Sequence, residues 1–392
     1  MLPITLHLKP GREKSVRNRH PWVFEGAIAR EEGPRDAAIG LLFDAAGRQV
    51  ASGFYSRHSQ IRLRAIAFGD QVADHALIRT RIDEALERRR TLISGNDTSA
   101  LRLIHSEGDD LSGLIVDRYD DALVVEITAA GLDRMSDALL DALREATGVQ
   151  HIYIKNDLPA RRLERLDLSD RSIGDPSRER TILENGLRFI VQPGGGQKTG
   201  FFLDQRDNRL LVRSFAGGRK VLNLFSYTGG FGVYASAGGA TVVDEVDVSA
   251  DALALARRNH ELNESAADVT LIEADAFEWV RELVGRGERY DLVVCDPPPF
   301  ARSRGEVERA ARGYKDINLQ ALKLIEPGGL LLTFTCSGHM DADLFQKIIF
   351  SAALDARRSV RILRRLGAGA DHPVSIYCPE GEYLRGMMVE VR

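Results

Sequence analysis

The stretch from Lys220 to Val248 constrains the fold more than any other part of the chain. An apolar run (221–225) leads into a loop of small residues (226–230), then an apolar segment (231–237), and a second apolar run ends in Asp247. Buried parallel strands read as continuous apolar runs, and glycines let the backbone approach a ligand closely. A carboxylate at the tip of the second strand can accept hydrogen bonds from both ribose hydroxyls of a nucleoside. The stretch therefore predicts a Rossmann-like unit that binds a nucleoside.

The glycine spacing in this loop favours a nucleoside cofactor without a pyrophosphate. A dinucleotide site needs the pattern G-x-G-x-x-G, which places the pyrophosphate on the N-terminus of the helix. Here the glycines are Gly229, Gly230 and Gly232, and the bulky Phe231 lies between them. This spacing suits S-adenosylmethionine, a nucleoside with a short zwitterionic tail. The alternative is a Rossmann-like unit with no assigned ligand.

The same unit is predicted to belong to a doubly wound, mostly parallel sheet. Predicted strands and helices alternate from 221 to 350, and ligands of such sheets bind beyond the carboxyl ends of the strands. Asp275, Asp296 and Cys336 each follow a predicted strand, as Asp247 does. We expect Asp275 to accept a hydrogen bond from the exocyclic amine of adenine. The three prolines after Asp296 fix the backbone and suit a rigid rim around a flat substrate.

A glycine-rich segment before the unit, residues 194–206, offers further cofactor contacts. Lys198 and Thr199 are candidates to bind a carboxylate of the cofactor. Phe201 or Phe202 is a candidate to cover its adenine ring. The alternative is a linker followed by a helix with Asp204 as its N-cap.

The position of Cys336 at a strand tip suggests covalent catalysis on cytosine. C5 of cytosine is a poor nucleophile, but attack of a thiolate on C6 makes C5 enamine-like and able to accept a methyl group. Asp296 is placed to hold N3 and the amino group of the base and to assist removal of the C5 proton, a role for which His339 is a weaker candidate. Cys295 and Cys378 are expected to be core residues, because most free cysteines are.

The first 72 residues have the short alternating runs of a small β barrel. Basic residues cluster just before Trp22 and Phe24, and cations beside aromatic rings suit RNA phosphates and bases. We expect Trp22 and Phe24 themselves to be core residues; the alternative for the basic cluster is a solvated face. This region resembles a PUA domain, a small RNA-binding barrel, in R-N-R-H-P-W-V-F (17–24) and the following Gly26. The predicted RNA contacts here are Arg12, Arg17 and Arg19.

Residues 73–191 are predicted to form a small α+β domain without a catalytic constellation. An amphipathic helix is expected at 74–92, a further helix at 132–147, and a hairpin at 181–191 with the turn signal Asn-Gly. The charged segment 161–180 lacks periodicity and is expected to be an exposed loop.

The composition is that of an ordinary protein of two or three domains, with 44% hydrophobic and 28% charged residues over 392 positions. The net charge of −4 means that any nucleic-acid binding must come from local patches. Three widely spaced cysteines form neither a disulfide framework nor a C-x-x-C metal site, so we expect a metal-free protein of the reducing cytoplasm. No segment has the pattern of a signal peptide or a membrane span, so no membrane partner is expected. The oligomeric state stays open, a homodimer included.

From 191 to 392, and less strictly along its whole length, the chain resembles the RlmI-type family of large-subunit (23S) ribosomal RNA cytosine-C5 methyltransferases. The matching segments are G-Q-K-T-G-F-F-L-D-Q-R-D-N-R (196–209), N-L-F-S-Y-T-G-G-F (223–231), V-D-V-S (246–249), D-P-P-P-F (296–300), R-G-Y-K-D-I-N (312–318), T-C-S-G-H (335–339) and D-H-P-V (371–374). The resemblance implies an α/β class I methyltransferase domain (192–392), preceded by a PUA-like RNA-binding barrel (1–72) and the α+β middle domain (73–191).

The resemblance also implies site residues and partners. Cys336 is the expected nucleophile, Asp296 its catalytic partner, and ribosomal RNA the expected substrate, with Arg312 and Lys315 as further RNA contacts. The expected cofactor is S-adenosyl-L-methionine. Its expected contacts are Lys198, Thr199, Phe201, Asp204, Asn223, Phe225, Tyr227, Thr228, Gly229, Asp247, Asp275 and Asp296.

The chain departs from the family's sequence pattern at two points, and two alternative functions stay open. The family often has Lys where Pro299 stands, and the chain has no Cys directly after Pro297, so a carboxylate or water must help to expel the enzyme. One rival is an amino-methyltransferase that uses Asp-Pro-Pro-Pro-Phe to hold an exocyclic amine and needs no cysteine. The other is a non-catalytic RNA-binding or assembly factor.

Overall fold

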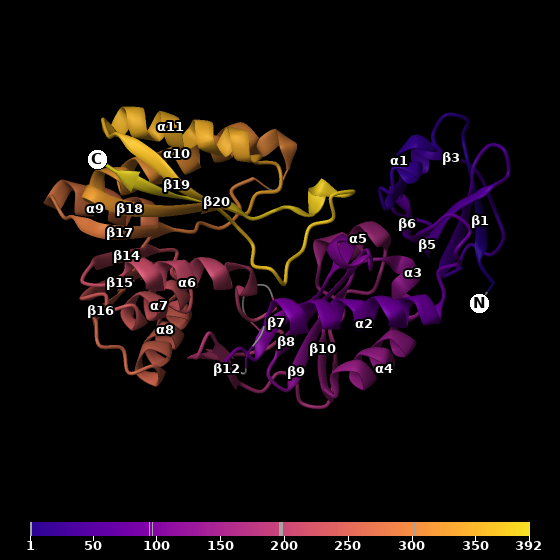
Figure 1. The fold of residues 1–392 in the computed structure, drawn as a ribbon, viewed down its shortest axis with the longest axis horizontal. Helices are drawn as coiled ribbons and strands as arrows, with labels where there is room; N and C mark the ends of the chain where they lie inside the picture. The colour runs from indigo at the N-terminus through magenta and orange to yellow at the C-terminus, as the bar shows by residue number, and fades with distance from the viewer. Residues whose placement is uncertain (1, 94, 96, 196–198, 302) are drawn as a thin grey trace. The chain divides into compact units, whose positions relative to one another are not determined.

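The computed structural model describes the chain except for residues 1, 94, 96, 196–198 and 302. It forms two compact units (Figure 1), and each unit takes in a segment that is distant from the rest of it in the sequence. The first unit comprises Met1–Ile182, Val191–Leu203 and Ala370–Gly381; the second comprises Leu183–Ile190, Asp204–Gly369 and Glu382–Arg392. The three-domain division at residues 72 and 191 stays a prediction, and the exchange of 183–190 and 370–381 was not anticipated from the sequence.

The N-terminal part of the first unit is a six-stranded sheet in the order β2-β6-β5-β4-β1-β3. Side chains of β1 alternate between buried and half-buried, and Ile4, Leu6 and Leu8 lie in the core, as expected for a strand with one buried face. The predicted strands of this region are therefore confirmed. The elements are β1 (Ile4–Leu8), α1 (Lys14–Arg17), β2 (Trp22–Phe24), β3 (Ile28–Glu32), β4 (Ile39–Phe43), β5 (Gln49–Tyr55) and β6 (Ile61–Phe68).

The rest of the first unit combines a five-stranded sheet, in the order β11-β10-β9-β8-β7, with helices whose apolar stripes join its core. Helix α2 begins at His75 because the Asp74 side chain accepts a hydrogen bond from the Leu77 N–H at 2.8 Å, which confirms the predicted helix. The elements are α2 (His75–Leu92), β7 (Ala100–His105), β8 (Leu114–Tyr119), β9 (Ala122–Ile127), α3 (Ala130–Asp133), α4 (Ser136–Thr147), β10 (His151–Ile154), α5 (Pro159–Glu164) and β11 (Arg171–Ile173).

The expected exposed loop at 161–180 was wrong. It contains the end of α5 and all of β11, and Arg161 is one of the most buried side chains of the chain. The Arg161 guanidinium donates to the carbonyl oxygens of Ile127 and Asp167 and to the Asp133 carboxylate, so its burial leaves the charge compensated. Hydrophobic periodicity cannot reveal a buried arginine of this kind. By contrast, the Asn185-Gly186 hairpin, β12 (Arg180–Glu184) with β13 (Leu187–Val191), is confirmed.

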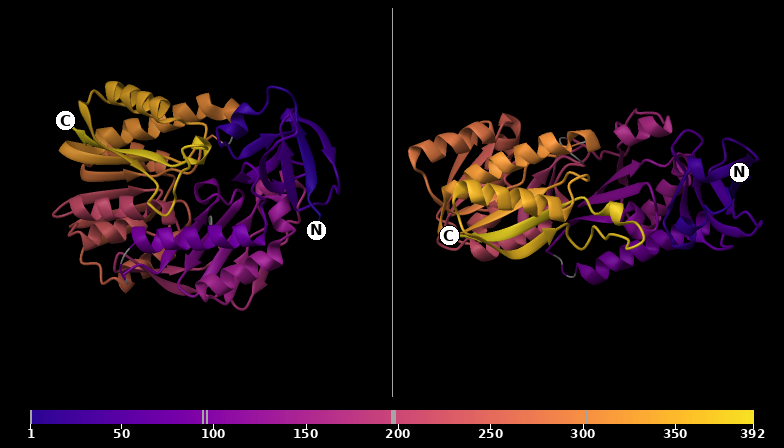
Figure 2. Two further views of the ribbon diagram at one scale, coloured as in Figure 1. Left: turned by 45° about the vertical axis from the view of Figure 1, so that its right-hand side comes forward. Right: turned by 90° about the horizontal axis from the view of Figure 1, so that it is seen from above.

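The second unit is built on a seven-stranded sheet in the order β16-β15-β14-β17-β18-β20-β19, in which only β20 is antiparallel to its neighbours. Buried residues of α9, α10 and α11 pack on one face of the sheet and those of α6 and α7 on the other (Figure 2). The doubly wound, mostly parallel sheet is confirmed. The strands are β14 (Lys220–Leu224), β15 (Val242–Asp247), β16 (Asp268–Glu273), β17 (Tyr290–Cys295), β18 (Ile325–Thr335), β19 (Val360–Gly367) and β20 (Arg385–Val391).

The helices of the second unit differ from expectation at two points. Asp204 is not an N-cap: α6 starts at Arg206 with Gln205 as its N-cap residue. From its apolar pattern alone, the segment 317–325 predicts a helix; α10 begins ten residues earlier, at Val307, because its first turns lie partly exposed and lack that pattern. The helices are α6 (Arg206–Phe215), α7 (Gly230–Ala237), α8 (Ala250–Leu262), α9 (Ala276–Arg286), α10 (Val307–Leu324) and α11 (Ala342–Ala356). Across the described residues, none of the helices combines the length and apolarity that crossing a bilayer requires.

Candidate active site at the carboxyl edge of the second sheet

The loop after β14 is tightly turned and is held by the tip of β15. Phe225, Tyr227 and Gly229 all have positive φ, at 59°, 49° and 77°, a backbone conformation that only glycine adopts without cost. The Ser226 N–H donates to the Val246 carbonyl at 2.9 Å, and the Tyr227 N–H donates to Asp247 Oδ2 at 2.9 Å. The predicted loop and the predicted acid therefore lie in contact.

A buried carboxylate beneath the loop supports it, and sequence reasoning missed it. Glu245 is fully buried in β15; its oxygens accept hydrogen bonds from Asn223 Nδ2 at 2.6 Å and lie 3.0 Å from His260 Nε2. Gly232 is required at the start of α7, because a Cβ there would lie 1.8 Å from Glu245 Oε1. Asn259 completes the support by donating to the Thr228 carbonyl at 2.8 Å. The available signal was a pair of acids, Asp244 and Glu245, between the valines of β15.

The loop carries buried polar atoms that fit a polar ligand. Asn223 Oδ1, Ser226 Oγ and Thr228 Oγ1 have no hydrogen-bond partner within the described part of the chain. Buried polar atoms are nearly always paired, so three unpaired atoms between 223 and 228, at the end of β14 and in the loop after it, indicate a group that binds there. Half-buried Asp247 accepts the Ser249 N–H at Oδ1 as well as the Tyr227 N–H, and each oxygen retains a second lone pair for a ribose hydroxyl. These residues fit S-adenosylmethionine.

Asp275 follows β16 at the same edge and is exposed. Its Oδ1 caps α9, accepting the N–H groups of Phe277 and Glu278 at 2.8 and 3.1 Å. This capping role alone is enough to explain why position 275 is an aspartate, without any bound ligand. The two capping hydrogen bonds nonetheless fix the direction of the carboxylate. It lies at the same edge of the sheet as the loop after β14.

Three half-buried phenylalanine rings form a row along this edge, and the row ends on the fully buried ring of Tyr314. Phe225 and Phe277 lie 6.3 Å apart between ring centroids, Phe277 and Phe300 5.8 Å, and Phe300 and Tyr314 4.6 Å. Phe225 follows β14, Phe277 opens α9 and Phe300 ends the proline loop. The row offers flat apolar surfaces for a nucleoside or a base. Sequence reasoning named Phe225 as a cofactor contact and Phe300 only within the Asp-Pro-Pro-Pro-Phe segment, and it did not name Phe277.

Asp296 stands directly after β17 and is half-buried. Gln205 Nε2 donates to its Oδ2 at 2.9 Å, and Asn208 Nδ2 in turn donates to Gln205 Oε1 at 2.6 Å. Both amides are buried, so the direction of the Asp296 carboxylate is set by a chain of two hydrogen bonds from α6. The Q-R-D-N sequence around these amides was noted only as part of a family segment, and their contact with Asp296 was not anticipated.

Cys336 directly follows β18, the parallel neighbour of β17; with Cys295 opposite Thr333, it lies two positions beyond the residue opposite Asp296, beside the proline loop. Its thiol is partly exposed and donates to the Pro297 carbonyl at 3.8 Å. The following Ser337 is buried; its Oγ lies 3.1 Å from the Tyr314 hydroxyl and accepts the Ala301 N–H at 3.3 Å. The loop that presents the thiol is therefore anchored to α10 and to the end of the proline loop.

The other two cysteines are sealed from solvent, as expected. Cys295 and Cys378 are both fully buried. Burial and the neighbouring Asp296 raise the pKa of the Cys295 thiol far above its usual range, and burial together with Glu107 and Glu380 raises the pKa of Cys378 to about 12. A thiol that cannot ionise is a poor nucleophile. His339 is exposed in the loop beyond Cys336.

The residues predicted from the glycine-rich segment divide between the two units. Lys198 lies outside the described residues. Thr199 and Phe201 are buried in the first unit, where the Thr199 hydroxyl donates to Asp117 Oδ2 at 2.7 Å and lies 2.7 Å from the Tyr119 hydroxyl. Asp204 belongs to the second unit, and its Oδ2 accepts the Tyr383 hydroxyl at 2.6 Å.

The predicted RNA contacts of the first unit have unequal surroundings. Arg12 is exposed and lines a cavity of about 610 Å³ beside α1, together with Lys14, Trp22 and Phe24. Phe24 is 49% exposed and Trp22 half-buried, so the expectation that both belong to the core was wrong. The short strand β2 at the sheet edge leaves them uncovered, and Trp22 donates its Nε1–H to Glu107 at 2.8 Å.

Three of the four remaining predicted cations contact other side chains of the protein. Arg17 forms an ion pair with buried Asp44 at 3.2 Å, and the Arg19 guanidinium lies over the rings of Phe68 and Tyr377 at 5.5 and 5.4 Å. In the second unit, Lys315 pairs with Asp355 at 2.7 Å, whereas Arg312 is exposed on α10.

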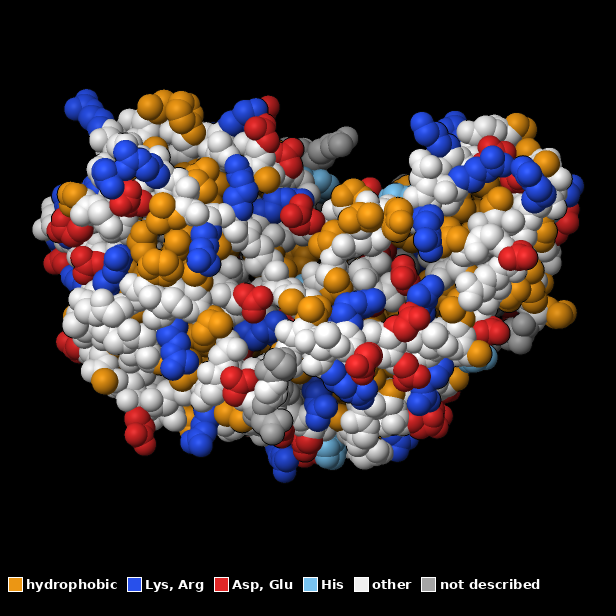
Figure 3. All heavy atoms as spheres, in the orientation of Figure 1, with side chains coloured by type: hydrophobic (Ala, Val, Ile, Leu, Met, Phe, Trp, Pro, Cys, Tyr) orange, Lys and Arg blue, Asp and Glu red, His pale blue; other side chains and the backbone are white. Residues whose placement is uncertain are grey.

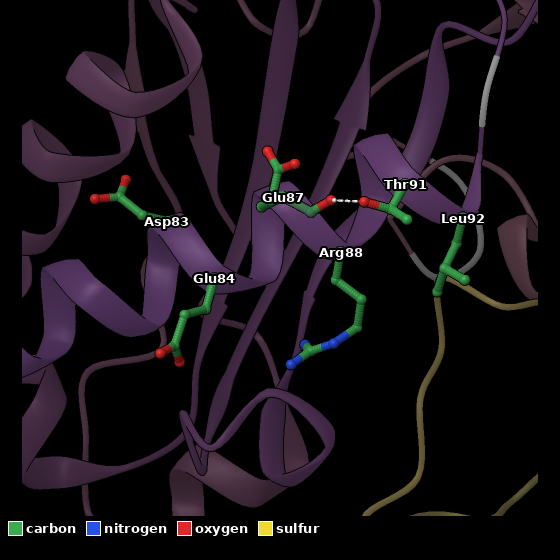
Figure 4. Close-up of a pocket in the computed structure, with 6 residues that line it drawn as sticks. All are labelled: Asp83, Glu84, Glu87, Arg88, Thr91 and Leu92. Atoms are coloured by element: carbon green, nitrogen blue, oxygen red, sulfur yellow. Dashed lines mark hydrogen bonds between the residues drawn. The ribbon is translucent and has the colours of Figure 1, made fainter.

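A surface hollow of about 620 Å³ lies along α2 in the first unit (Figure 4). The close-up shows the Thr91 hydroxyl turned back to the Glu87 carbonyl of the helix, a bond of 3.0 Å. Its charged groups are exposed carboxylates and one guanidinium, which do not form a site for methyl transfer. It is lined by Asp83, Glu84, Glu87, Arg88, Thr91 and Leu92.

Comparison with known proteins agrees with this geometry. The profile of an S-adenosylmethionine-dependent methyltransferase family matches residues 145–374, and that of a PUA-like domain matches 6–68. A relative from Tolumonas auensis, named ribosomal RNA large subunit methyltransferase I, is 43% identical, with 98% of both chains covered. A relative of the same name from Photobacterium profundum is 42% identical, with 99% of both chains covered.

Two solved structures share the fold at lower sequence identity. A SAM-dependent methyltransferase from Streptococcus mutans superposes with a TM-score of 0.82 at 22% identity, covering 98% of this chain and 99% of its own. A methyltransferase called SMU.776, complexed with SAH, gives a TM-score of 0.83 at 22% identity and full coverage of both chains. At this identity the likeness shows the fold alone.

Proposed function

The chain belongs to the S-adenosylmethionine-dependent methyltransferase family, and from this premise we propose that it methylates C5 of a cytosine in large-subunit ribosomal RNA. The observation that carries the proposal is the thiol of Cys336, which is partly exposed at the tip of β18 and lies 3.8 Å from the Pro297 carbonyl of the proline loop that follows Asp296. The names of the relatives supply the class of RNA.

We assign the cofactor to the loop after β14 and its neighbours. Asp247 is suited to hold the ribose hydroxyls, the orphaned oxygens of Asn223 and Thr228 to meet the polar groups of the ligand, and Asp275 with Phe277 to hold the adenine. When bound there, S-adenosylmethionine supplies an electrophilic methyl group on a sulfonium sulfur. Contacts from Thr199, Phe201 and Asp204 stay predictions.

The reaction begins with bond formation between the Cys336 sulfur and C6 of the cytosine. The electrons of the C5–C6 double bond move toward N3, where Asp296, held by Gln205, stabilises the proton that N3 gains. C5 is now enamine-like and would accept the methyl group as the bond from that group to the sulfonium sulfur breaks, which would leave S-adenosylhomocysteine, and N3 would release the proton that it gained. A carboxylate or water removes the C5 proton; the double bond re-forms, and the sulfur leaves as the C6–S bond breaks.

Substitution of Cys336 tests this chemistry. We expect Cys336→Ala to bind S-adenosylmethionine with unchanged affinity in calorimetry and to lose methyl transfer to protein-free ribosomal RNA below detection. Cys295→Ala, at a sealed thiol on the neighbouring strand, is the matched control and should retain transfer. Retained transfer by Cys336→Ala would instead support an amino-methyltransferase that uses Asp296 and Phe300. Absence of S-adenosylmethionine binding by the unmodified protein would favour a non-catalytic RNA-binding factor.

A further inference from the structure

The outer strand of the second unit, β19, has an exposed basic surface. It pairs with β20, and its five central residues, 361–365, are all exposed. Five arginines and no acid occur between 357 and 365, in a chain whose net charge is −4. Figure 3 shows Lys and Arg side chains, with hydrophobic ones among them, over the region where Figure 1 draws β19 and α11.

The pairing register divides these arginines between the two faces of the sheet. Arg364 is opposite Met388 and Arg361 opposite Glu390, two residues further along β20, so Arg361 and Arg364 share a face. Arg365 is opposite Met387 and donates to Gln346 of α11 at 2.5 Å, which puts it on the other face. The irregularity at Leu363 brings Arg361 and Arg364 to about 7 Å apart along the strand.

The face with Arg361 and Arg364 is the one on which Cys336 packs. Met388, the partner of Arg364, belongs to the same apolar cluster as Cys336 and Leu366. The charges there are incompletely compensated. Arg361 forms an ion pair with Glu390 at 3.5 Å, whereas Arg364 has none with any described carboxylate.

The strand also leads to the catalytic edge. Thr335, Arg385 and Gly367 lie in one row across β18, β20 and β19, and Cys336 follows Thr335 directly. Neighbouring strands are about 4.8 Å apart, so the end of β19 lies on the order of 10 Å from the strand that presents the thiol. Arg364 and Arg361 precede Gly367 by three and six residues, roughly 10 and 17 Å along the strand, so an RNA strand held by them would run on toward the reacting base.

We propose that Arg361 and Arg364 form a phosphate-binding track on β19 that holds the RNA strand beside the Cys336 loop. The proposal rests on the proposed function, since it takes RNA as the substrate. Guanidinium groups at this spacing suit successive phosphates of a single strand. Charged edge strands also prevent edge-to-edge pairing of sheets, and two copies of this strand would repel one another. Charge complementarity therefore favours RNA over a second copy as the occupant.

The test compares the full-length protein with an Arg361→Gln/Arg364→Gln variant in titrations with poly(C) at several salt concentrations. We expect the affinity at low salt to fall about ten-fold and the slope of log affinity against log salt to decrease by about 1.4, because each phosphate contact with a single strand releases about 0.7 counterion. The apparent KM for ribosomal RNA should rise by a similar factor. The value of kcat should change by no more than about two-fold, because these arginines bind the RNA without taking part in the reaction.

Arg364→Gln and Arg365→Gln form a matched pair, with the same charge change at adjacent positions on opposite faces. Only Arg364→Gln should weaken poly(C) binding. Equal effects of the two, or an unchanged salt slope in the double variant, would overturn the track. A change in sedimentation without a change in RNA binding would identify the strand as an interface between copies and would also overturn it. If the unmodified protein binds neither poly(C) nor ribosomal RNA, both the proposed function and the phosphate-binding track are wrong. If only the track is wrong, the unmodified protein still binds RNA and transfers the methyl group.

Discussion

The carboxylate of Asp296 accepts a hydrogen bond from the buried amide of Gln205. Gln205 donates to Asp296 Oδ2, and Asn208 fixes Gln205 by donating both to its Oε1 and to the Gly367 carbonyl. An amide neither neutralises the carboxylate nor transfers a proton to it. Gln205 is thus a positioning residue that holds the Asp296 carboxylate without changing its charge.

We predict that Gln205→Leu lowers kcat about 10- to 100-fold, because a hydrogen bond to a charged group contributes roughly 1.5–3 kcal/mol. S-adenosylmethionine affinity, measured by calorimetry, should change less than kcat, since Gln205 contacts Asp296 and not the loop after β14. Leu210→Gln, on an exposed part of the same helix, serves as the control for folding of α6 and should leave kcat unchanged. A Gln205→Leu enzyme with an unaltered kcat would show that Asp296 needs no orientation.

At the scale of elements, the cofactor loop depends on close packing between α7 and β15. Glu245 is buried with its oxygens against Asn223 and His260, and the start of α7 passes directly above it. Only a residue without a side chain fits at position 232. The backbone conformation of residues 225–229 therefore depends on the close contact between Gly232 and Glu245 beneath the loop.

Gly232→Ala is predicted to destabilise the protein by about 1–3 kcal/mol, the usual cost of inserting a methyl group into a well-packed site. The added Cβ would lie 1.8 Å from Glu245 Oε1, so the loop must shift, and S-adenosylmethionine affinity should fall with stability. Denaturant unfolding and calorimetry measure the two effects. Gly285→Ala in α9 is the matched control: its Cβ meets nothing within 4 Å, so it should stabilise by about 0.5–1 kcal/mol. Equal stability of the two variants would contradict the packing argument.

Most elements of the second unit were predictable because periodicity and glycine spacing are local. The runs before Asp247, Asp275, Asp296 and Cys336 gave the strands and their ends. What local patterns could not supply were contacts between distant parts of the chain. The amide of Gln205 against Asp296 spans 91 positions and involves two residues with no unusual local pattern. Long-range partners of polar side chains, rather than the positions of strands, were the missing information.

The two units are joined by exchanged segments. Residues 370–381, between β19 and β20, fold into the first unit, where Asp371 is fully buried and its Oδ2 accepts the Arg102 N–H at 3.0 Å. The Asp371 carbonyl also accepts a hydrogen bond from Arg89 at 2.7 Å. The D-H-P-V segment that matches the family is thus explained by anchoring within the first unit.

One measurement tests the central claim, that the sulfur of Cys336 becomes bonded to C6 of a cytosine. The full-length protein is incubated with S-adenosylmethionine and ribosomal RNA in which 5-fluorocytidine replaces cytidine, then denatured and digested for mass spectrometry of the peptides. Fluorine at C5 cannot leave as a proton, so the account predicts an adduct that survives denaturation, with a methylated nucleotide attached to the peptide that contains Cys336. Methyl transfer to unmodified RNA without any such adduct, or an adduct at another residue, would contradict it.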